Sequence, residues 1–404
     1  MVISMLPEPF QTATAILREI EQHHHQAFFV GGCVRDFLLK RPIGDIDIAT
    51  SATPDLIQRI FEKVIPVGIE HGTVVVRYKK ESYEVTTFRI DGTYSDSRHP
   101  DHVEFIDQLD KDLERRDFTI NALAMDKSGA IIDLFASRAD LQHKLIRTVG
   151  NGFDRFTEDP LRIIRALRFS SELGFQIDKE TLFYMKKVKE AINNLAVERI
   201  TTELGKFFAG KYVNNGITYL KDTEAYKHIP VFTKYPQIIS LLPTHLKPLY
   251  SLGEVLALLH LLEPTVTVKE WVKEWKCSNQ IKQEALQLVE ACNHYKSNGI
   301  NDWLVYQLSP AYYQGFIRLI NTLFLKKQVS LQELISRMNN LPITSRTDIV
   351  IKGNDLIDLY PHAKRGPWLQ QTITSIEKEI VAGNLKNDNY NIKEWIKCNP
   401  PEIN

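Results

Sequence analysis

The chain has 404 residues, of which 43% are hydrophobic and 25% charged, with 50 basic and 50 acidic side chains. This composition is typical of a soluble globular protein of two to four domains, and no apolar run approaches the roughly 20 residues needed to cross a bilayer. Residues 1–210 carry 28 basic and 32 acidic side chains and residues 211–404 carry 22 and 18, a bias too weak to identify a polyanion-binding half.

The N-terminal segment and the cysteines indicate the compartment. Residues 1–10 lack the basic and then apolar pattern of a signal peptide. The four cysteines lie far apart and show no paired metal-ligand spacing, so they are expected to be reduced thiols: Cys33, Cys277, Cys292 and Cys398. We therefore expect a cytoplasmic protein without a membrane anchor.

Residues 1–150 predict a mixed α/β domain, because helical periodicity alternates with short strand-like runs. A helix is expected over Gln11–His24. The expected strands are Phe28–Val30, Thr73–Tyr78, Ser82–Phe88, Val103–Ile106 and Ile131–Asp133.

The stretch after the first strand has the features of a phosphate-binding turn. Gly31 and Gly32 follow the strand, and the absence of side chains there lets a phosphate approach the backbone. A helix over Cys33–Leu39 is expected to begin on this turn. Its first amides would then point toward a bound anion.

Two carboxylates follow on what reads as a second strand that opens at Gly44. Side chains alternate along a strand, so Asp45 and Asp47 should share one face, about 7 Å apart, while Ile46 and Ile48 point into the core. Two carboxylates beside an anion-binding turn are what a magnesium nucleotide needs.

Glu84 is a candidate third carboxylate. Alternation in the strand around it places Glu84 on the face opposite Tyr83 and Val85. An ordinary exposed glutamate and a ligand that completes a two-metal site from a neighbouring strand both fit this pattern, and both interpretations stay open.

Two further polar segments precede the helical half. Residues 91–100 hold the glycine and proline expected of a surface loop. Arg115 and Arg116 precede an apolar segment that we expect to begin a helix, and one of them could hold a triphosphate bidentately. An arginine pair alone is more often a solvated surface.

From Asp154 onward the pattern is helical almost throughout, since apolar residues recur at intervals of three and four. No repeat of fixed period and no low-complexity linker interrupts it. The expected helices are Pro160–Leu173, Lys179–Asn193, Val197–Phe208, Tyr212–Leu220, Gly253–Leu261, Val268–Trp275, Asn279–His294, Pro310–Leu325, Leu331–Asn339, Gly353–Leu359 and Trp368–Ala382.

The first of these helices carries polar residues on adjoining faces. Steps of three separate Asp159, Arg162, Arg165 and Arg168. In one interpretation Asp159 is an N-cap before Pro160 and the arginines lie in solvent. In the other, Asp acceptors and Arg donors together address the Watson–Crick edge of a base.

These motifs, in this order, resemble a known family. Gly31-Gly32, twelve residues and Asp45-Ile-Asp47 are similar to the signature of the nucleotidyltransferase superfamily that includes DNA polymerase β. Further segments of the chain resemble more closely the class II tRNA nucleotidyltransferases, the CCA-adding enzymes. These segments are Tyr94-Ser-Asp-Ser-Arg98, Arg115-Arg116-Asp117-Phe-Thr-Ile-Asn-Ala, Glu158-Asp159-Pro-Leu-Arg162-Ile-Ile-Arg165-Ala-Leu-Arg168-Phe and Glu198-Arg199-Ile, with weaker similarity at Ile351-Lys-Gly-Asn-Asp-Leu-Ile and Gly366-Pro-Trp.

The resemblance implies a nucleotidyltransferase head over 1–150, followed by a helical neck over 151–210, a body over 211–310 and a tail over 311–404 that binds tRNA. It implies that Mg²⁺ binds Asp45 and Asp47, with Glu84 as a supporting catalytic carboxylate. The nucleotide-binding residues would be Gly32, Arg35 and Arg116 for phosphates and sugar, Asp159 and Arg162 for the base of CTP or ATP, and Arg165 and Arg168 as support.

The implied activity is addition of CCA to the 3′ end of tRNA without a nucleic-acid template. Residues 91–98 would then be the flexible loop that lets the pocket change from C to A. Related alternatives are a CC-adding enzyme, an A-adding enzyme and a poly(A) polymerase, and a different one is a catalytically inactive RNA-binding protein. The complete loop argues against the CC-adding enzyme, and the paired Asp45 and Asp47 argue against an inactive protein. The oligomeric state stays open, with a homodimer as one option.

Overall fold

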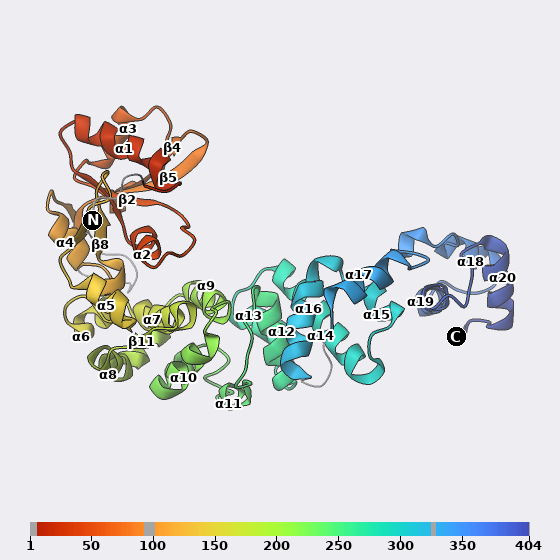
Figure 1. The fold of residues 1–404 in the computed structure, drawn as a ribbon. Coiled ribbons are helices and arrows are strands. Elements are labelled where there is room, and N and C mark those ends of the chain that lie inside the picture. Colours follow the sequence, from red (N-terminus) through yellow and green to blue (C-terminus); the bar gives the residue numbers. More distant parts are fainter. Residues whose placement is uncertain (1–5, 93–101, 325–328, 404) are drawn as a thin grey trace. The chain divides into compact units, whose positions relative to one another are not determined.

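The computed structural model describes residues 6–92, 102–324 and 329–403, and it divides the chain into two compact units, Met1–Ser240 and Leu241–Asn404 (Figure 1). The first unit holds all strands found among the described residues. The second is helical. No helix of the described residues is long and apolar enough to cross a membrane.

The first unit is built on a seven-stranded sheet of mixed direction. In spatial order its strands are β3 (Val64–Gly68), β4 (Thr73–Tyr78), β5 (Glu81–Thr87), β2 (Asp47–Thr50), β1 (Ala27–Val30), β8 (Leu123–Met125) and β9 (Ile131–Asp133). β2 and β5 run parallel, and the other neighbours are antiparallel. Two further strand pairs are β6 (Arg89–Asp91) with β7 (Val103–Phe105), and β10 (Leu145–Ile146) with β11 (Gln176–Ile177).

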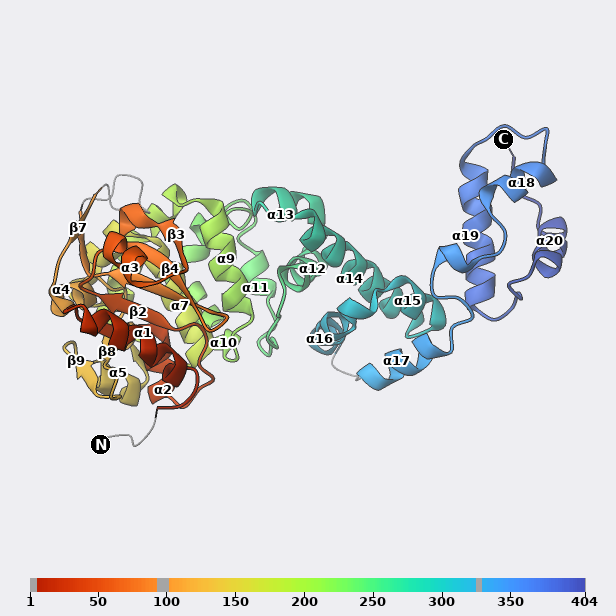
Figure 2. The same cartoon turned by 90° about the horizontal axis from the view of Figure 1, so that it is seen from above.

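Two helices cover one face of this sheet. α1 (Phe10–Gln22) packs on β1 and α3 (Pro54–Ile60) packs on β4, and both lie over the strands in Figures 1 and 2. Val74 and Val76 of β4 are fully buried on that side. On the opposite face, Val30, Ala49 and Ala124 belong to a second buried apolar cluster, and beside it lie Asp47 and the exposed Glu84.

The helices that the periodicity predicts in the first unit are present, with ends that differ by a few residues, whereas α3 (Pro54–Ile60) was not predicted. α7 (Leu161–Leu173) buries eleven of its thirteen residues. Four of the buried residues are polar or charged and lie beyond the apolar stripe that periodicity predicts: Arg162, Arg168, Ser170 and Ser171. The other helices are α2 (Gly32–Leu38), α4 (Leu109–Glu114), α5 (Ser137–His143), α6 (Gly152–Glu158), α8 (Lys179–Val188), α9 (Val197–Phe208), α10 (Val213–Thr223) and α11 (Ile238–Leu241).

The second unit is an array of amphipathic helices. One of its apolar cores gathers Trp368, Ile376 and Ile380 of its C-terminal part with Leu356 and Ile392. The helices are α12 (Leu252–Leu262), α13 (Val268–Glu274), α14 (Asn279–Asn298), α15 (Asp302–Gln307), α16 (Tyr313–Leu323), α17 (Leu331–Asn339), α18 (Gly353–Leu359), α19 (Pro367–Val381) and α20 (Asn389–Cys398).

The second predicted strand is shorter than expected. β2 begins at Asp47 and not at Gly44, because its partner β1 ends at Val30, which stands opposite Asp47, before the chain turns at Gly31. Asp45 therefore precedes the strand. The predicted alternation still holds around it, since Ile46 and Ile48 are both buried.

Other predicted boundaries also moved. The segment after Arg116 does not begin a helix: a short 3-10 turn over Thr119–Asn121 leads into the fully buried strand β8, which was not predicted. α15 and α20 were missed as well. Each of these two helices begins after a residue type that is also common in loops. In the structure Asn301 and Asp388 are the N-caps of α15 and α20, and their side chains accept hydrogen bonds from backbone N–H groups.

Candidate active site

Two carboxylates stand side by side at the centre of the open sheet face. Asp47 on β2 lies directly opposite Glu84 on β5, so their Cα atoms belong to strands about 4.8 Å apart. Asp45 precedes β2 and is exposed, as is Glu84, whereas Asp47 is half-buried. The expectation of a carboxylate on the neighbouring strand is met in placement.

The electrostatics of Asp47 reflect this crowding. Burial, then the negative charge of Glu84, raises the pKa of Asp47 to about 6; Asp45 adds to the rise and Arg116 opposes it. The raised pKa means that burial and the neighbouring negative charges together outweigh the opposing effect of the Arg116 charge.

The donor chemistry of these residues fits a divalent cation. Carboxylate oxygens are the ligands that Mg²⁺ prefers, and a cation would relieve the repulsion that raises the pKa of Asp47. No three His, Cys, Asp or Glu side chains of the described part of the chain already converge in a metal-binding geometry.

The glycine turn has the close approach that its sequence predicts. Gly31 has φ of +73°, and a Cβ built there would lie 3.0 Å from Nη1 of Arg116 and 3.8 Å from Oδ2 of Asp47. A side chain would therefore be strained and would crowd the arginine. Glycine here keeps the backbone open between the carboxylate and Arg116.

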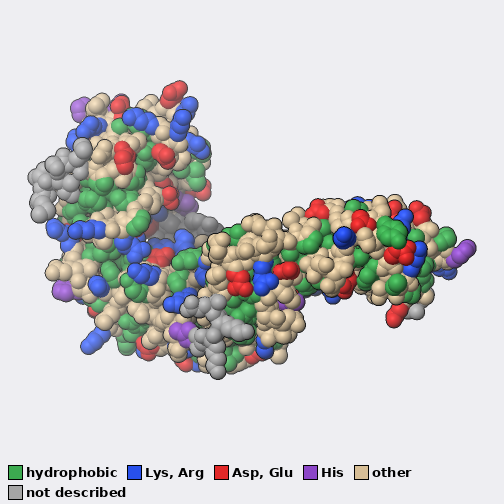
Figure 3. All heavy atoms as spheres, turned by 45° about the vertical axis from the view of Figure 1, so that its right-hand side comes forward, with side chains coloured by type: hydrophobic (Ala, Val, Ile, Leu, Met, Phe, Trp, Pro, Cys, Tyr) green, Lys and Arg blue, Asp and Glu red, His purple; other side chains and the backbone are tan. Residues whose placement is uncertain are grey.

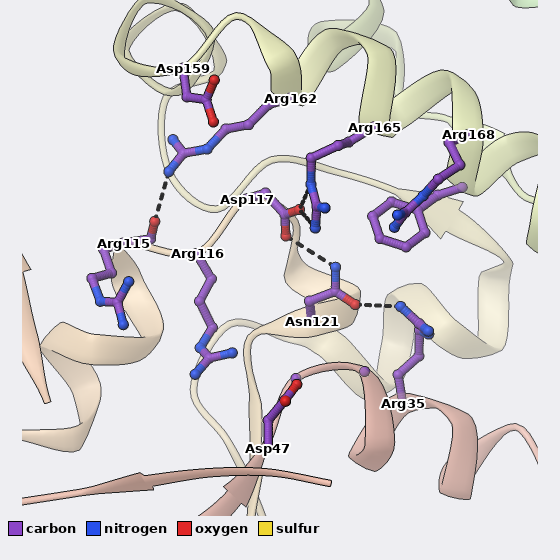
Figure 4. Close-up of a pocket in the computed structure, with 13 residues that line it drawn as sticks. Arg35, Asp47, Arg115, Arg116, Asp117, Asn121, Asp159, Arg162, Arg165 and Arg168 are labelled. Carbon is purple, nitrogen blue, oxygen red and sulfur yellow. Dashed lines mark hydrogen bonds and ion pairs between the residues drawn. The ribbon is translucent and has the colours of Figure 1, made fainter. Parts of the chain in front are cut away.

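A cavity of about 420 Å³ lies over this turn, and Figure 4 shows α7 arginines pointing into it from one side and Asp47 and Arg116 from the other. On the face drawn in Figure 3, basic side chains of the first unit gather where its surface is hollowed. The lining residues are Gly31, Gly32, Arg35, Asp47, Arg115, Arg116, Asp117, Asn121, Asp159, Arg162, Arg165, Arg168 and Phe169.

Arg115 and Arg116 are anchored by a carboxylate that the sequence did not single out. Asp112 has no exposed surface and accepts from Nη2 of Arg115 at 2.7 Å and from Nη2 of Arg116 at 3.2 Å. Burial acts to raise the pKa of Asp112, but the two arginines outweigh it and lower the pKa. Nε of Arg116 is buried without a hydrogen-bond partner, so this cavity-lining arginine has a donor to offer.

A chain of hydrogen bonds crosses the cavity wall from α7 to Arg35 on α2. Arg165 donates from Nε and Nη2 to Oδ2 of Asp117 at 2.8 and 2.6 Å. Oδ1 of Asp117 accepts from Asn121 at 3.0 Å, and Oδ1 of Asn121 accepts from Arg35 at 2.7 Å (Figure 4). Burial would raise the pKa of Asp117, yet Arg165 and Asn121 hold it well below its usual range.

Asp159 and Arg162 are held separately at the entrance of α7. Oδ1 of Asp159 accepts at 3.1 Å from the amide of Leu161, where the helix begins. Arg162 donates to the Arg115 carbonyl at 3.1 Å and to Glu158 at 2.8 Å. The N-cap interpretation is therefore wrong: Pro160 holds the N-cap position of α7, and Asp159 is the C-cap of α6. Arg162 is buried and lines the cavity, so it does not lie in solvent as that interpretation also predicted.

Arg168 closes the far end of the cavity. Its guanidinium lies 4.1 Å from the centre of the Phe169 ring and 3.2 Å from Oε2 of Glu203 on α9. Both charged side chains are buried, and Nε of Arg168 has no hydrogen-bond partner. This ring and this carboxylate hold the arginine in one orientation.

The structure brings together all seven residues that the resemblance assigned to the nucleotide: Gly32, Arg35, Arg116, Asp159, Arg162, Arg165 and Arg168. Asp45 lies in an adjoining hollow with Asp47, and Glu84 lines neither. Of the flexible loop predicted over residues 91–98, Asp91 ends strand β6, and residues 93–98 lie outside the described residues. Sequence reasoning gave no role to Asp112, Asp117, Asn121 and Glu203. The signal that could have found one of them is the helical spacing of Asp112, which lies three and four residues before Arg115 and Arg116.

Models of three known families match the chain. The poly(A) polymerase head domain matches residues 27–147, the probable RNA- and SrmB-binding site of polymerase A matches 174–235, and the putative domain 2 of tRNA nucleotidyltransferase matches 254–396. Together these cover most of the first unit and most of the second.

Relatives of the same length match over the whole chain. A CCA-adding enzyme of Oceanobacillus iheyensis is 48% identical over 99% of this chain and 100% of its own, and one of Anoxybacillus flavithermus is 39% identical over 98% and 99%. Among solved structures, the Bacillus stearothermophilus CCA-adding enzyme in complex with CTP is 32% identical and superposes with a TM-score of 0.87, covering 98% of each chain.

Proposed function

This chain belongs to the CCA-adding enzymes, and we propose that the cavity of its first unit adds C, C and A to the 3′ end of tRNA from CTP and ATP, without a nucleic-acid template. The observation that carries this proposal is the placement of Asp47 opposite Glu84 beneath a cavity lined by arginines. Carboxylates beside cationic donors are what transfer of a nucleotidyl group from a triphosphate requires.

Asp45 and Asp47 would hold Mg²⁺, with Glu84 as the supporting carboxylate. When bound there, magnesium would lower the pKa of the tRNA 3′-hydroxyl and neutralise the charge that develops on pyrophosphate. The raised pKa of Asp47 supports this assignment, because a bound cation would replace the proton that the crowded carboxylates otherwise favour.

The triphosphate would lie between the glycine turn and Arg116. The guanidinium of Arg116 lies beside Gly31 through its Nη1, at a point where the backbone leaves room for a phosphate. Arg35, whose guanidinium is fixed by Asn121, would bind at the sugar and phosphates with Gly32. This arrangement would place the α-phosphorus close to Asp47, in line with attack by the 3′-hydroxyl.

The base would be read by Asp159 and Arg162. Asp offers only acceptors and Arg only donors, so the pair can match the Watson–Crick edge of cytosine or adenine in place of a template. The partners of both residues fix the directions of these groups. Arg165 and Arg168 would support the pocket through Asp117 and Glu203.

The remaining parts follow from the same premise. We propose a head over 1–150, a neck over 151–210, a body over 211–310 and a tail over 311–404, with the helical second unit contributing to the grip on tRNA and the enzyme acting in the cytoplasm. Duplex RNA is recognised largely by shape and backbone charge, so this grip should weaken with salt.

Product length tests the proposal. Purified protein with Mg²⁺, CTP and ATP should extend a tRNA that ends at its discriminator base by three nucleotides and then stop. Extension by two nucleotides, by one A after CC or by a long A tail would identify a CC-adding enzyme, an A-adding enzyme or a poly(A) polymerase instead.

Variants of the carboxylates test the site. Asp45→Ala and Asp47→Ala should each abolish extension, and Glu84→Gln should reduce it. Glu81→Gln is the matched control, because Glu81 lies on the same strand and is exposed. Full activity of Asp47→Ala would show that the metal site lies elsewhere.

A further inference from the structure

The row of residues that contains the carboxylates continues across the sheet as an apolar surface. Asp47 stands opposite Glu84, Glu84 opposite Val75 of β4, and Val75 opposite Ile65 of β3. Directly opposed residues in neighbouring strands project from the same face of the sheet. The face that holds the carboxylates therefore leads, strand by strand, to Val75 and then to Ile65.

This surface is open in the described part of the chain. Ile65 is 43% exposed and Val75 partly exposed, whereas the alternate residues Val74 and Val76 are fully buried beneath α1 and α3. β3 is the edge strand of the sheet. Ile65 therefore lies exposed at the sheet edge, in the same row as Asp47 and Glu84. It lacks, among the described residues, the covering helix that Val74 and Val76 have on the other face.

We propose that Val75 and Ile65 form a platform on which the growing 3′ end of the RNA rests while its 3′-hydroxyl faces Asp47 and Glu84. This inference rests on the proposed function. The distances suit such an occupant: strand spacing places Val75 about 5 Å and Ile65 about 10 Å from Glu84 along the row. A ribose at the carboxylates would then bring the flat face of a base over the aliphatic side chains.

The incoming nucleotide cannot be the occupant, because its cavity is lined by residues of the glycine turn, the Arg115–Asn121 segment and α7, and includes neither Val75 nor Ile65. The platform lies on the opposite side of the carboxylates from β1 and this turn, since β2 separates β5 from β1 in the sheet. Primer and nucleotide would thus meet at Asp47 from two sides. Apolar contact with base faces carries little sequence preference, which suits a site that must accept three different 3′ ends in turn.

Steady-state kinetics with separate variation of tRNA and CTP test the platform. Ile65→Ala should raise the KM for tRNA about three- to tenfold, and Ile65→Asp should raise it by more than about tenfold, because a carboxylate there would also repel the RNA backbone. The KM for CTP should stay within about twofold of the wild-type value. Leu134→Ala is the control, since Leu134 is equally exposed but follows β9 at the other edge of the sheet.

A primer with an abasic nucleotide distinguishes stacking from a general effect. Two tRNA substrates are compared, one abasic at the terminal position and one abasic at the preceding position. For the substrate that lacks the base resting on Ile65, the KM for tRNA should be the same in Ile65→Ala as in wild type. An undiminished penalty at both positions would overturn the proposal, as would unchanged KM values for tRNA in both Ile65 variants of an enzyme that adds CCA. If the wild-type protein is a dimer and Ile65→Asp is a monomer, the surface serves self-association, and this result too would overturn the proposal. A wild-type chain that extends no tRNA would instead contradict the proposed function.

Discussion

The carboxylate of Asp159 is held by Arg199, whose Nη2 donates to Oδ2 at 2.9 Å from the neighbouring helix α9. The other oxygen of Asp159 accepts the Leu161 amide. Each oxygen therefore has a fixed direction before a nucleotide arrives. A residue that is to replace a template base needs this rigidity, because a mobile acceptor would accept several bases equally.

Arg199→Ala should therefore relax base selection. A hydrogen bond to a charged group contributes about 1.5–3 kcal/mol, so the ratio of kcat/KM for CTP to that for UTP should fall about tenfold or more. The comparison of kcat/KM for the four nucleotides measures this. Arg59→Ala, an exposed arginine of α3, serves as control. An unchanged ratio with a uniform loss of activity would assign Arg199 to stability only.

Much of this site could be predicted from the sequence, because the relevant signals are local. The Gly31–Gly32 turn, the Asp45 and Asp47 spacing and the helical spacing of Asp159, Arg162, Arg165 and Arg168 each lie within one short segment. The placement of Glu84 beside Asp47 needed one further step, the pairing of two strands, and alternation restricted it to one of two faces.

The internal partners of the α7 arginines could not be predicted in the same way. Asp117 and Glu203 acquire their roles only when distant segments meet, since their partners Arg165 and Arg168 lie on α7. The start of β2 was misplaced for a related reason. A strand ends where its partner ends, and the end of β1 is set by the turn at Gly31.

Asp47→Asn should stabilise the metal-free protein at high pH. The folded state holds the pKa of Asp47 at about 6, above the ordinary value, so stability contributed by its proton is present at low pH and is lost as pH rises through about 6. At pH 8 the variant should exceed wild type by up to about 3 kcal/mol, and below pH 4 the two should converge. Urea unfolding in a chelator measures this.

Magnesium supplies the control for that comparison. The cation should raise the melting temperature of wild type more than that of Asp47→Asn, because the variant lacks a ligand. Glu81→Gln should behave as wild type throughout. A stability difference between Asp47→Asn and wild type that is the same at pH 5 and pH 8 would contradict the assignment of the pH dependence to Asp47.

Arg116→Ala should weaken triphosphate binding more than Arg115→Ala does. Both arginines bind Asp112, but only Arg116 lies within reach of the glycine turn and has an unpaired buried donor. We expect the KM for CTP and ATP to rise about 10- to 100-fold in Arg116→Ala, with little change in the ratio between the two nucleotides. Arg116→Lys should recover only part of the loss, because an ammonium lacks the planar fork. An equal effect of the Arg115 and Arg116 variants would contradict this division.

The pair of Arg165 and Asp117 should couple folding to base selection. Asp117→Ala leaves Arg165, whose side chain is 30% exposed, without its two hydrogen bonds to that carboxylate, and we expect this to cost about 1.5–3 kcal/mol in the free energy of unfolding. Arg165→Met should cost less, because Asp117 keeps its bonds to Asn121 and to the Phe118 amide.

The double variant Asp117→Ala/Arg165→Met should then be more stable than the sum of the single losses predicts, since removal of both partners leaves no uncompensated charge. Urea unfolding of all four proteins gives this coupling energy. Activity gives an independent readout: because Asp117 also connects through Asn121 to Arg35, the single variants should raise the KM for CTP and lower discrimination against UTP together. Two results together would contradict this coupling: losses in the free energy of unfolding that simply add in the double variant, and normal nucleotide selection in the single variants. They would show that the hydrogen bonds from Arg165 to Arg35 do not connect folding to base selection.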